Sequence, residues 1–268
     1  KNYISIKNPA NHDIKTAKKE NVGIKSRIGF SYGKYRAKIK FPPLVNSDGV
    51  WTGLTNAFWL AYQSESDWNK RRLCQEKGYV KHSKNDAEAE REQTTHYSEI
   101  DIEMIKTSKY WTAEELQKDN PIGNDKFVLA CTNWDMACPN PRKFHTGGIQ
   151  TINYKGNNFN LHRWSETYRA LTSRIELNNS IFHNDFYYFE IEWKPTEIIW
   201  RIGKNENNMQ IVGYMNEEVT AIPNNQMTSI VTQEFHYSEW WLPEVFEQGL
   251  IPFNKQDLEG KIFEIIIE

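Results

Sequence analysis

The chain has 268 residues and a formal net charge of −2, so it lacks the strong positive charge that is typical of nucleic-acid-binding proteins. No apolar stretch is long enough to cross a bilayer as a helix, and no membrane span is therefore predicted. All-β sandwiches of this length often form one domain, and we expect a single domain over residues 1–268.

Short runs rich in β-branched and aromatic residues, separated by glycine and proline, recur along the chain. They predict strands at residues 33–41, 57–62, 98–105, 126–132, 148–154, 186–193, 197–202, 227–233 and 261–267. Many short strands with turns between them indicate an all-β sandwich. The polar segment at about 63–97 predicts an insertion, either a solvated surface loop or one wall of a binding site. A short helix is predicted within residues 111–125.

Residues 99–103 read Glu-Ile-Asp-Ile-Glu, in which acidic and β-branched residues alternate. Alternation with a period of two predicts a strand with its three carboxylates on one face and its isoleucines on the other. Like charges on one face raise the pKa of at least one member, which does not help folding. Glycoside hydrolysis, however, requires one carboxylate that attacks and one carboxyl that donates a proton. A calcium site or a merely exposed acidic strand would be the alternative.

Metal, redox and nucleotide motifs are not found. The sequence has three cysteines, Cys74, Cys131 and Cys138, without zinc-site spacing; Cys131 and Cys138 could close a small loop, or all three could be free thiols. No P-loop, dinucleotide-binding fingerprint or HExxH motif occurs. We therefore predict no required cofactor and no metal ligand; a structural calcium ion is possible but nothing in the sequence indicates one.

Four segments, in this order, resemble motifs of glycoside hydrolase family 16. They are residues 31–40 (SYGKYRAKIK), 56–60 (NAFWL), 99–103 (EIDIE) and 186–195 (FYYFEIEWKP), and the last is followed by 198–200 (IIW). The similarity runs from about residue 25 to the C-terminus. The chain departs from the family pattern at Tyr187, where the family has histidine, and at Arg36, where it has glutamate.

This resemblance implies a concanavalin-like β-jelly-roll sandwich of two antiparallel sheets, with a sugar-binding cleft across one of them. It also implies retaining, endo-acting hydrolysis of a β-linked polysaccharide. Carried over by position, Glu99 would be the nucleophile, Glu103 the acid/base and Asp101 the residue that tunes both. The motif without an extra residue before its last glutamate is similar to that of the lichenase branch, which favours a β-1,3/1,4-glucan. A secreted, periplasmic or cell-surface location is implied as well, and we expect a monomer.

Further residues near the motif are candidates for sugar contacts, although packing roles are equally compatible with each of them. Tyr97 lies on the same predicted strand face as Glu99, whereas Asn56 and Trp59 face opposite ways on their strand, so that only one can reach the substrate. The other candidates are Asn133, Trp134, Gln233, His236 and Trp240. Three alternative functions stay open: an algal galactan hydrolase, a transglycosylase using the same residues, and a carbohydrate-binding protein without turnover.

Overall fold

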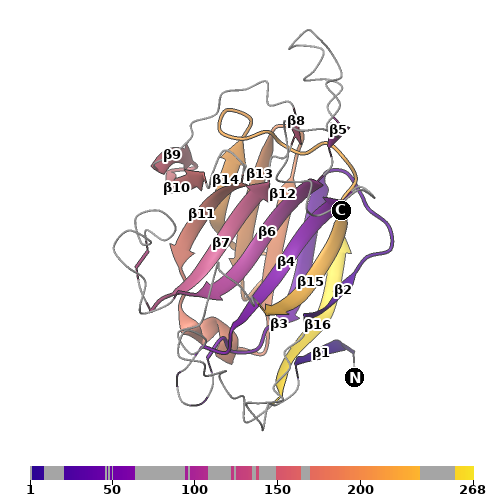
Figure 1. Ribbon diagram of the computed structural model, residues 1–268, viewed down its shortest axis with the longest axis vertical. Coiled ribbons are helices and arrows are strands. Elements are labelled where there is room, and N and C mark those ends of the chain that lie inside the picture. The colour runs from indigo at the N-terminus through magenta and orange to yellow at the C-terminus, as the bar shows by residue number, and fades with distance from the viewer. Residues whose placement is uncertain are drawn as a thin grey trace.

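Two antiparallel β-sheets, stacked face to face, form the computed structural model of the protein (Figure 1). The structure describes residues 2–8, 21–45, 47, 49, 51–63, 94–95, 97–107, 122–123, 125–134, 137–138, 149–163, 170–235 and 257–268. The strands are β1 (Ile4–Asn8), β2 (Val22–Lys25), β3 (Gly33–Lys40), β4 (Leu54–Gln63), β5 (Thr94–Thr95), β6 (Tyr97–Lys106), β7 (Phe127–Trp134), β8 (Ala137–Cys138), β9 (Ile149–Tyr154), β10 (Asn157–Arg163), β11 (Ala170–Glu176), β12 (Tyr187–Trp193), β13 (Glu197–Gly203), β14 (Gln210–Asn216), β15 (Thr228–Phe235) and β16 (Leu258–Ile267).

The strand order places the acidic motif near the middle of one sheet. One sheet of the sandwich has six strands in the order β1-β16-β3-β12-β13-β14, and the other has eight in the order β2-β15-β4-β6-β7-β11-β10-β9. A separate two-stranded sheet pairs β5 with β8. Strand β6, which carries residues 99–103, lies between β4 and β7. The first and the last strand are neighbours in the six-stranded sheet, where β1 pairs with the first half of β16. The predicted all-β sandwich is confirmed.

Every strand predicted from the sequence is present, but several others were not predicted. Strand β10 is the clearest case, because it contains three asparagines, which rarely occur in strands. Strand β10 pairs with β9 and β11, and cross-strand side-chain hydrogen bonds from Asn153 to Asn158 and from Thr151 to Asn160, each 2.8 Å long, add to this pairing. The predicted insertion at 63–97 and the predicted helix at 111–125 lie for the most part outside the described residues.

The core fills the space between the two sheets and takes up much of the aromatic content. Trp193, Trp200, Ile100 and Ile102 are fully buried there. Cys131, which is directly opposite Ile102 on the neighbouring strand, is a free thiol whose pKa is raised well above its usual value by burial. In the part of the chain that the structure describes, no helix is long and apolar enough to cross a membrane.

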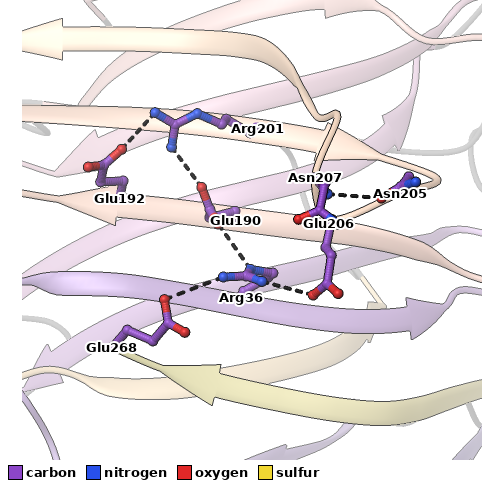
Figure 2. A network of polar contacts seen from close by, with 8 residues as sticks. All are labelled: Arg36, Glu190, Glu192, Arg201, Asn205, Glu206, Asn207 and Glu268. Carbon is purple, nitrogen blue, oxygen red and sulfur yellow. Dashed lines mark hydrogen bonds and ion pairs between the residues drawn. The ribbon is translucent and has the colours of Figure 1, made fainter.

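The outer face of the six-stranded sheet carries a ladder of compensated charges (Figure 2). Glu190 on β12 is directly opposite Arg36 on β3 and Arg201 on β13, and it forms ion pairs with both, at 3.1 and 2.7 Å. Arg36 also contacts Glu206 and Glu268, at 3.0 and 3.4 Å. Opposite charges on neighbouring strands stabilise a sheet, so Arg36, which departs from the family pattern, has a structural role here.

Candidate active site

The three carboxylates of residues 99–103 lie on the outer face of the eight-stranded sheet, which we call the acidic face. The register of β6 against both β4 and β7 is continuous from Tyr97 onward, without a bulge, so the alternation of the sequence is preserved. Ile100 and Ile102 are fully buried in the core. Glu99, Asp101 and Glu103 consequently point away from it, as the pattern predicted.

The direct neighbours of these acids on the adjacent strands are small or uncharged. Asp101 is opposite Trp59 on β4 and Thr132 on β7. Glu99 is opposite Ala61 on β4 and Trp134 on β7. Glu103 is opposite Ala57 on β4 and Ala130 on β7. None of these six neighbours is cationic. The contrast with the ladder of Figure 2, where glutamates face arginines directly, indicates that the acidic face is not arranged for stability.

Glu99 is held by an aromatic pair at one end of the motif. The hydroxyl of Tyr97 donates a hydrogen bond to the Glu99 carboxylate. The Tyr97 ring is buried and meets the edge of the Trp134 ring at right angles, with the centroids 6.3 Å apart. A donor directed at a carboxylate stabilises its ionised form. Tyr97 thus positions Glu99, while the partly exposed Trp134 is the member of the pair that can contact a ligand.

Asp101, in the middle of the motif, is buried among charges of its own sign. The pKa of Asp101 is raised well above its usual value, first by burial and then by the charges of Glu99 and Glu103. Both carboxyl oxygens of Asp101 are buried and have no hydrogen-bond partner among the described residues, so nothing there compensates the ionised form. Asp101 is therefore favoured to hold a proton.

Glu103 is the second carboxyl whose ionisation is strongly disfavoured. Burial is the largest cause, and the charges of Glu99 and Glu234 add to it, so that its pKa rises to about 8. The charge of Arg174 on β11 acts in the opposite direction. A carboxyl that stays protonated at neutral pH can act as a general acid. Glu99 and Glu103 thus differ in environment, as an attacking and a donating residue must.

Three residues of this face were missed in the sequence. They are Thr232 and Glu234 on β15 and Arg174 on β11. The pairings of Thr232 with Ala57 and of Arg174 with Ala130 put Thr232 and Arg174 in the row of Glu103. Glu234 lies two residues after Thr232 on the same strand and therefore points to the same face. The strand predicted at 227–233 stopped one residue short of Glu234, and the strand of Arg174 was not predicted. Every second residue of this strand shares one face, so the series Thr228, Ile230 and Thr232 leads to Glu234. A strand predicted one residue longer would therefore have placed Glu234 on this face.

Three candidates for sugar contacts, Asn56, Asn133 and Gln233, lie on the opposite face of the sheet and are fully buried. The Asn56 side chain donates to the Pro42 carbonyl oxygen at 2.9 Å, and that of Asn133 donates to the Thr220 hydroxyl at 2.8 Å. Gln233 lies next to Ile6 and Gly260, between β15 and the six-stranded sheet. The expectation that these three amides contact a sugar is thus corrected: they satisfy buried polar groups inside the sandwich.

Of the remaining candidates, Trp59 is partly exposed on the acidic face, as its opposite facing to Asn56 required. His236 and Trp240 lie outside the described residues. Within the described ranges, no group of three or more histidine, cysteine, aspartate or glutamate side chains is arranged to hold a metal ion.

Comparison with known proteins establishes the fold. No family model and no curated protein sequence matches the chain. Among solved structures, a Bacteroides ovatus family 16 protein from a mixed-linkage glucan locus, in complex with a G4G4G3G product, has a TM-score of 0.55 at 12% identity over 99% of this chain and 81% of its own. A family 16 endo-glucanase from Bacteroides ovatus, in complex with G4G3G-2F-DNP, gives 0.54 at 12% identity, over 99% and 80%. The chain therefore has the β-jelly-roll fold of these glycoside hydrolase family 16 structures.

Proposed function

We propose that the protein is a glycoside hydrolase of family 16 type: a retaining, endo-acting β-glycanase. The observation that carries this proposal is the placement of Glu99, Asp101 and Glu103 on one face of a regular central strand, with no cationic direct neighbour. Two features support it further: the shared fold with endo-glucanases and the protonation of Glu103 at neutral pH. The fold alone would not assign an activity, because one fold hosts many functions.

The spacing of the two glutamates suits a double displacement. Four residues of strand separate the two Cα atoms by about 13 Å, and two glutamate side chains that lean toward each other bring their carboxyls to about 5–5.5 Å. This is the separation at which one carboxylate attacks the sugar directly, since no room is left for a water molecule between them. Retention of the anomeric configuration follows from two successive inversions.

In the first step, a Glu99 oxygen attacks the anomeric carbon while the bond to the leaving sugar breaks. Glu103 donates its proton to the departing glycosidic oxygen, which leaves Glu103 as a carboxylate. Asp101, whose pKa is raised well above its usual value, stays protonated and so lies beside the nucleophile without adding another negative charge. In the second step, Glu103 takes a proton from water, the hydroxide attacks the anomeric carbon, and Glu99 is released.

The substrate that we favour is a β-1,3/1,4-glucan. The neighbouring Bacteroides ovatus structures hold a G4G4G3G product and a G4G3G ligand, which supports this choice for the present chain. Trp59 and Trp134 flank Asp101 and Glu99 and offer indole rings on which sugar faces stack.

The test is release of reducing sugar from mixed-linkage β-glucan, with proton NMR of the first product. We expect the β-anomer to appear first; an initial α-anomer would exclude double displacement. Glu99→Ala should abolish hydrolysis, and azide should restore turnover by giving an α-glycosyl azide. Glu103→Ala with azide should give the β-azide from an aryl glycoside, because such a leaving group needs no proton. Glu218→Gln, at an exposed position, is the control and should keep wild-type rates.

A further inference from the structure

Glu234 is a fourth carboxylate on the acidic face, and the three-acid motif does not account for it. It lies on β15 opposite Thr55 of β4, two residue pairs beyond the row formed by Thr232, Ala57 and Glu103, and therefore on the same face of the sheet. Ala57 has only a methyl group, so the strand between Glu234 and Glu103 places no large side chain between them. Glu234 is partly buried, and its charge raises the pKa of both Asp101 and Glu103, which shows that it faces the same site.

A chain of hydrogen bonds connects Glu234 to the indole beside Asp101. Nε1 of Trp59 donates to Oγ1 of Thr232 at 3.0 Å, and Thr232 Oγ1 donates to Oε1 of Glu234 at 2.9 Å. An indole N–H can only donate, so the Thr232 hydroxyl must accept from it and has its own proton left for Glu234. The direction of the chain is thereby fixed, and Glu234 is its terminal acceptor.

An acceptor in this position selects among sugars. The carboxylate keeps lone pairs on both oxygens after the bond from Thr232, and these need hydrogen-bond donors. A free sugar hydroxyl is such a donor. A sulfate ester or a uronic acid carboxylate offers only acceptors and a second negative charge, and an alkylated or acylated hydroxyl has lost its proton. The Glu234 carboxylate can therefore both bind a free sugar hydroxyl and repel an anionic substituent.

We propose that Glu234 is a specificity-determining residue: it accepts a hydrogen bond from a free hydroxyl of the sugar bound beside Trp59 and excludes glycans that carry anionic substituents there. This inference rests on the proposed function in so far as the acidic face binds a glycan. It narrows the substrate class to neutral β-glycans and disfavours the sulfated galactans among the alternatives. Thr232 is the positioning residue, since it holds both the indole and the carboxylate.

The test measures binding in a background that cannot turn over. Glu99→Gln protein is titrated, by affinity electrophoresis, with mixed-linkage β-glucan and with the same glucan after carboxymethylation, so that only the charge and the blocked hydroxyls differ. We expect the neutral polymer to be bound at least about tenfold more tightly, as one charged hydrogen bond and one like-charge contact imply. Adding Glu234→Gln should weaken neutral binding about tenfold and reduce the preference by a similar factor, whereas adding Glu218→Gln should change neither.

A second variant separates the hydrogen bond from the charge. Thr232→Val removes the hydroxyl that orients Glu234 but keeps the negative charge, so neutral binding should weaken while the preference for the neutral polymer stays. The inference would be overturned if Glu234→Gln changed neither the affinity for the neutral polymer nor the preference for it over the carboxymethylated one. It would also be overturned if the Glu99→Gln protein bound both polymers equally, or bound neither. If the wild-type protein fails to hydrolyse the glucan but binds it with this preference, the proposed function fails and the role of Glu234 stands.

Discussion

The Tyr97 hydroxyl donates a hydrogen bond to the Glu99 carboxylate two residues further along the same strand. Side chains two residues apart in a strand point to the same face, so this contact follows directly from the strand geometry. Together with the edge-to-face contact between Tyr97 and Trp134, it fixes one end of the acidic motif. Tyr97, which the sequence left open as a sugar contact or a packing residue, is buried, and its hydroxyl contacts the proposed nucleophile.

Replacing Tyr97 by phenylalanine tests this role. Tyr97→Phe keeps the ring and its contact with Trp134 but removes the donor, so we expect kcat to fall about tenfold with little change in KM, as loss of one hydrogen bond to a charged group implies. The acidic limb of the pH profile should move to higher pH, because the ionised carboxylate loses a stabilising donor. An unchanged acidic limb and unchanged kcat would show that the tyrosine only packs.

The pH dependence of activity should report the protonation of Glu103. With its pKa raised to about 8, Glu103 is protonated below that pH and can donate, so kcat/KM should fall as the pH rises through about 8. The charges of Glu234 and Arg174 act on this pKa in opposite directions. Glu234→Gln should therefore move the basic limb to lower pH and Arg174→Gln should move it to higher pH, both measured as kcat/KM on a neutral oligosaccharide. Shifts in the same direction would contradict this arrangement.

The sequence alone was enough to predict the sandwich and the facing of Glu99, Asp101 and Glu103, because both depend on local alternation. It was not enough for Glu234 and Arg174, which reach the acidic face only through pairing of strands that are distant along the chain. The polar residues Asn56 and Asn133 could not be assigned either. A buried asparagine that satisfies a carbonyl oxygen of another segment looks the same in a sequence as one that binds a sugar.

The raised carboxyl pKa values should also make stability depend on pH. In the unfolded chain a glutamate carboxyl has a pKa near 4.5, whereas that of Glu103 in the folded protein is about 8. Between these values the folded state binds more protons than the unfolded state, so the free energy of unfolding falls as the pH rises from about 4.5 to about 8 and levels off above it. The burial of Asp101 and Glu234 acts with the same sign.

Glu103→Gln should remove part of this dependence. The variant cannot ionise at this position, so we expect it to be more stable than the wild type at pH 8 by roughly 1–3 kcal/mol, and equal to it near pH 4.5. Thermal unfolding of both proteins from pH 4.5 to 8.5 is the measurement. A constant difference in melting temperature over this range would mean that the pKa of Glu103 is the same in the folded and the unfolded protein.

We expect the buried amide of Asn133 to stabilise the fold and not to contact the ligand, and replacing Asn133 tests this role. Its side chain donates to the Thr220 hydroxyl and to the Ala221 carbonyl oxygen, at 2.8 and 3.0 Å, and thereby ties β7 to the segment after β14. Asn133→Ala leaves those buried acceptors without their donor, which should lower the free energy of unfolding by about 2–3 kcal/mol. The folded fraction should keep the KM of the wild type, because the amide lies on the face of the sheet away from the acids.

Asn153 provides the matched control: its side chain is exposed and donates across a hairpin to Asn158, and Asn153→Ala should cost less than about 1 kcal/mol. Urea unfolding gives the stability of each variant, and steady-state kinetics below the unfolding transition gives KM. If Asn133→Ala raised KM several-fold at unchanged stability, the amide would be a substrate contact after all. That result would require β7 to present Asn133 rather than Trp134 and Thr132 to the ligand, which the continuous register with β6 does not allow.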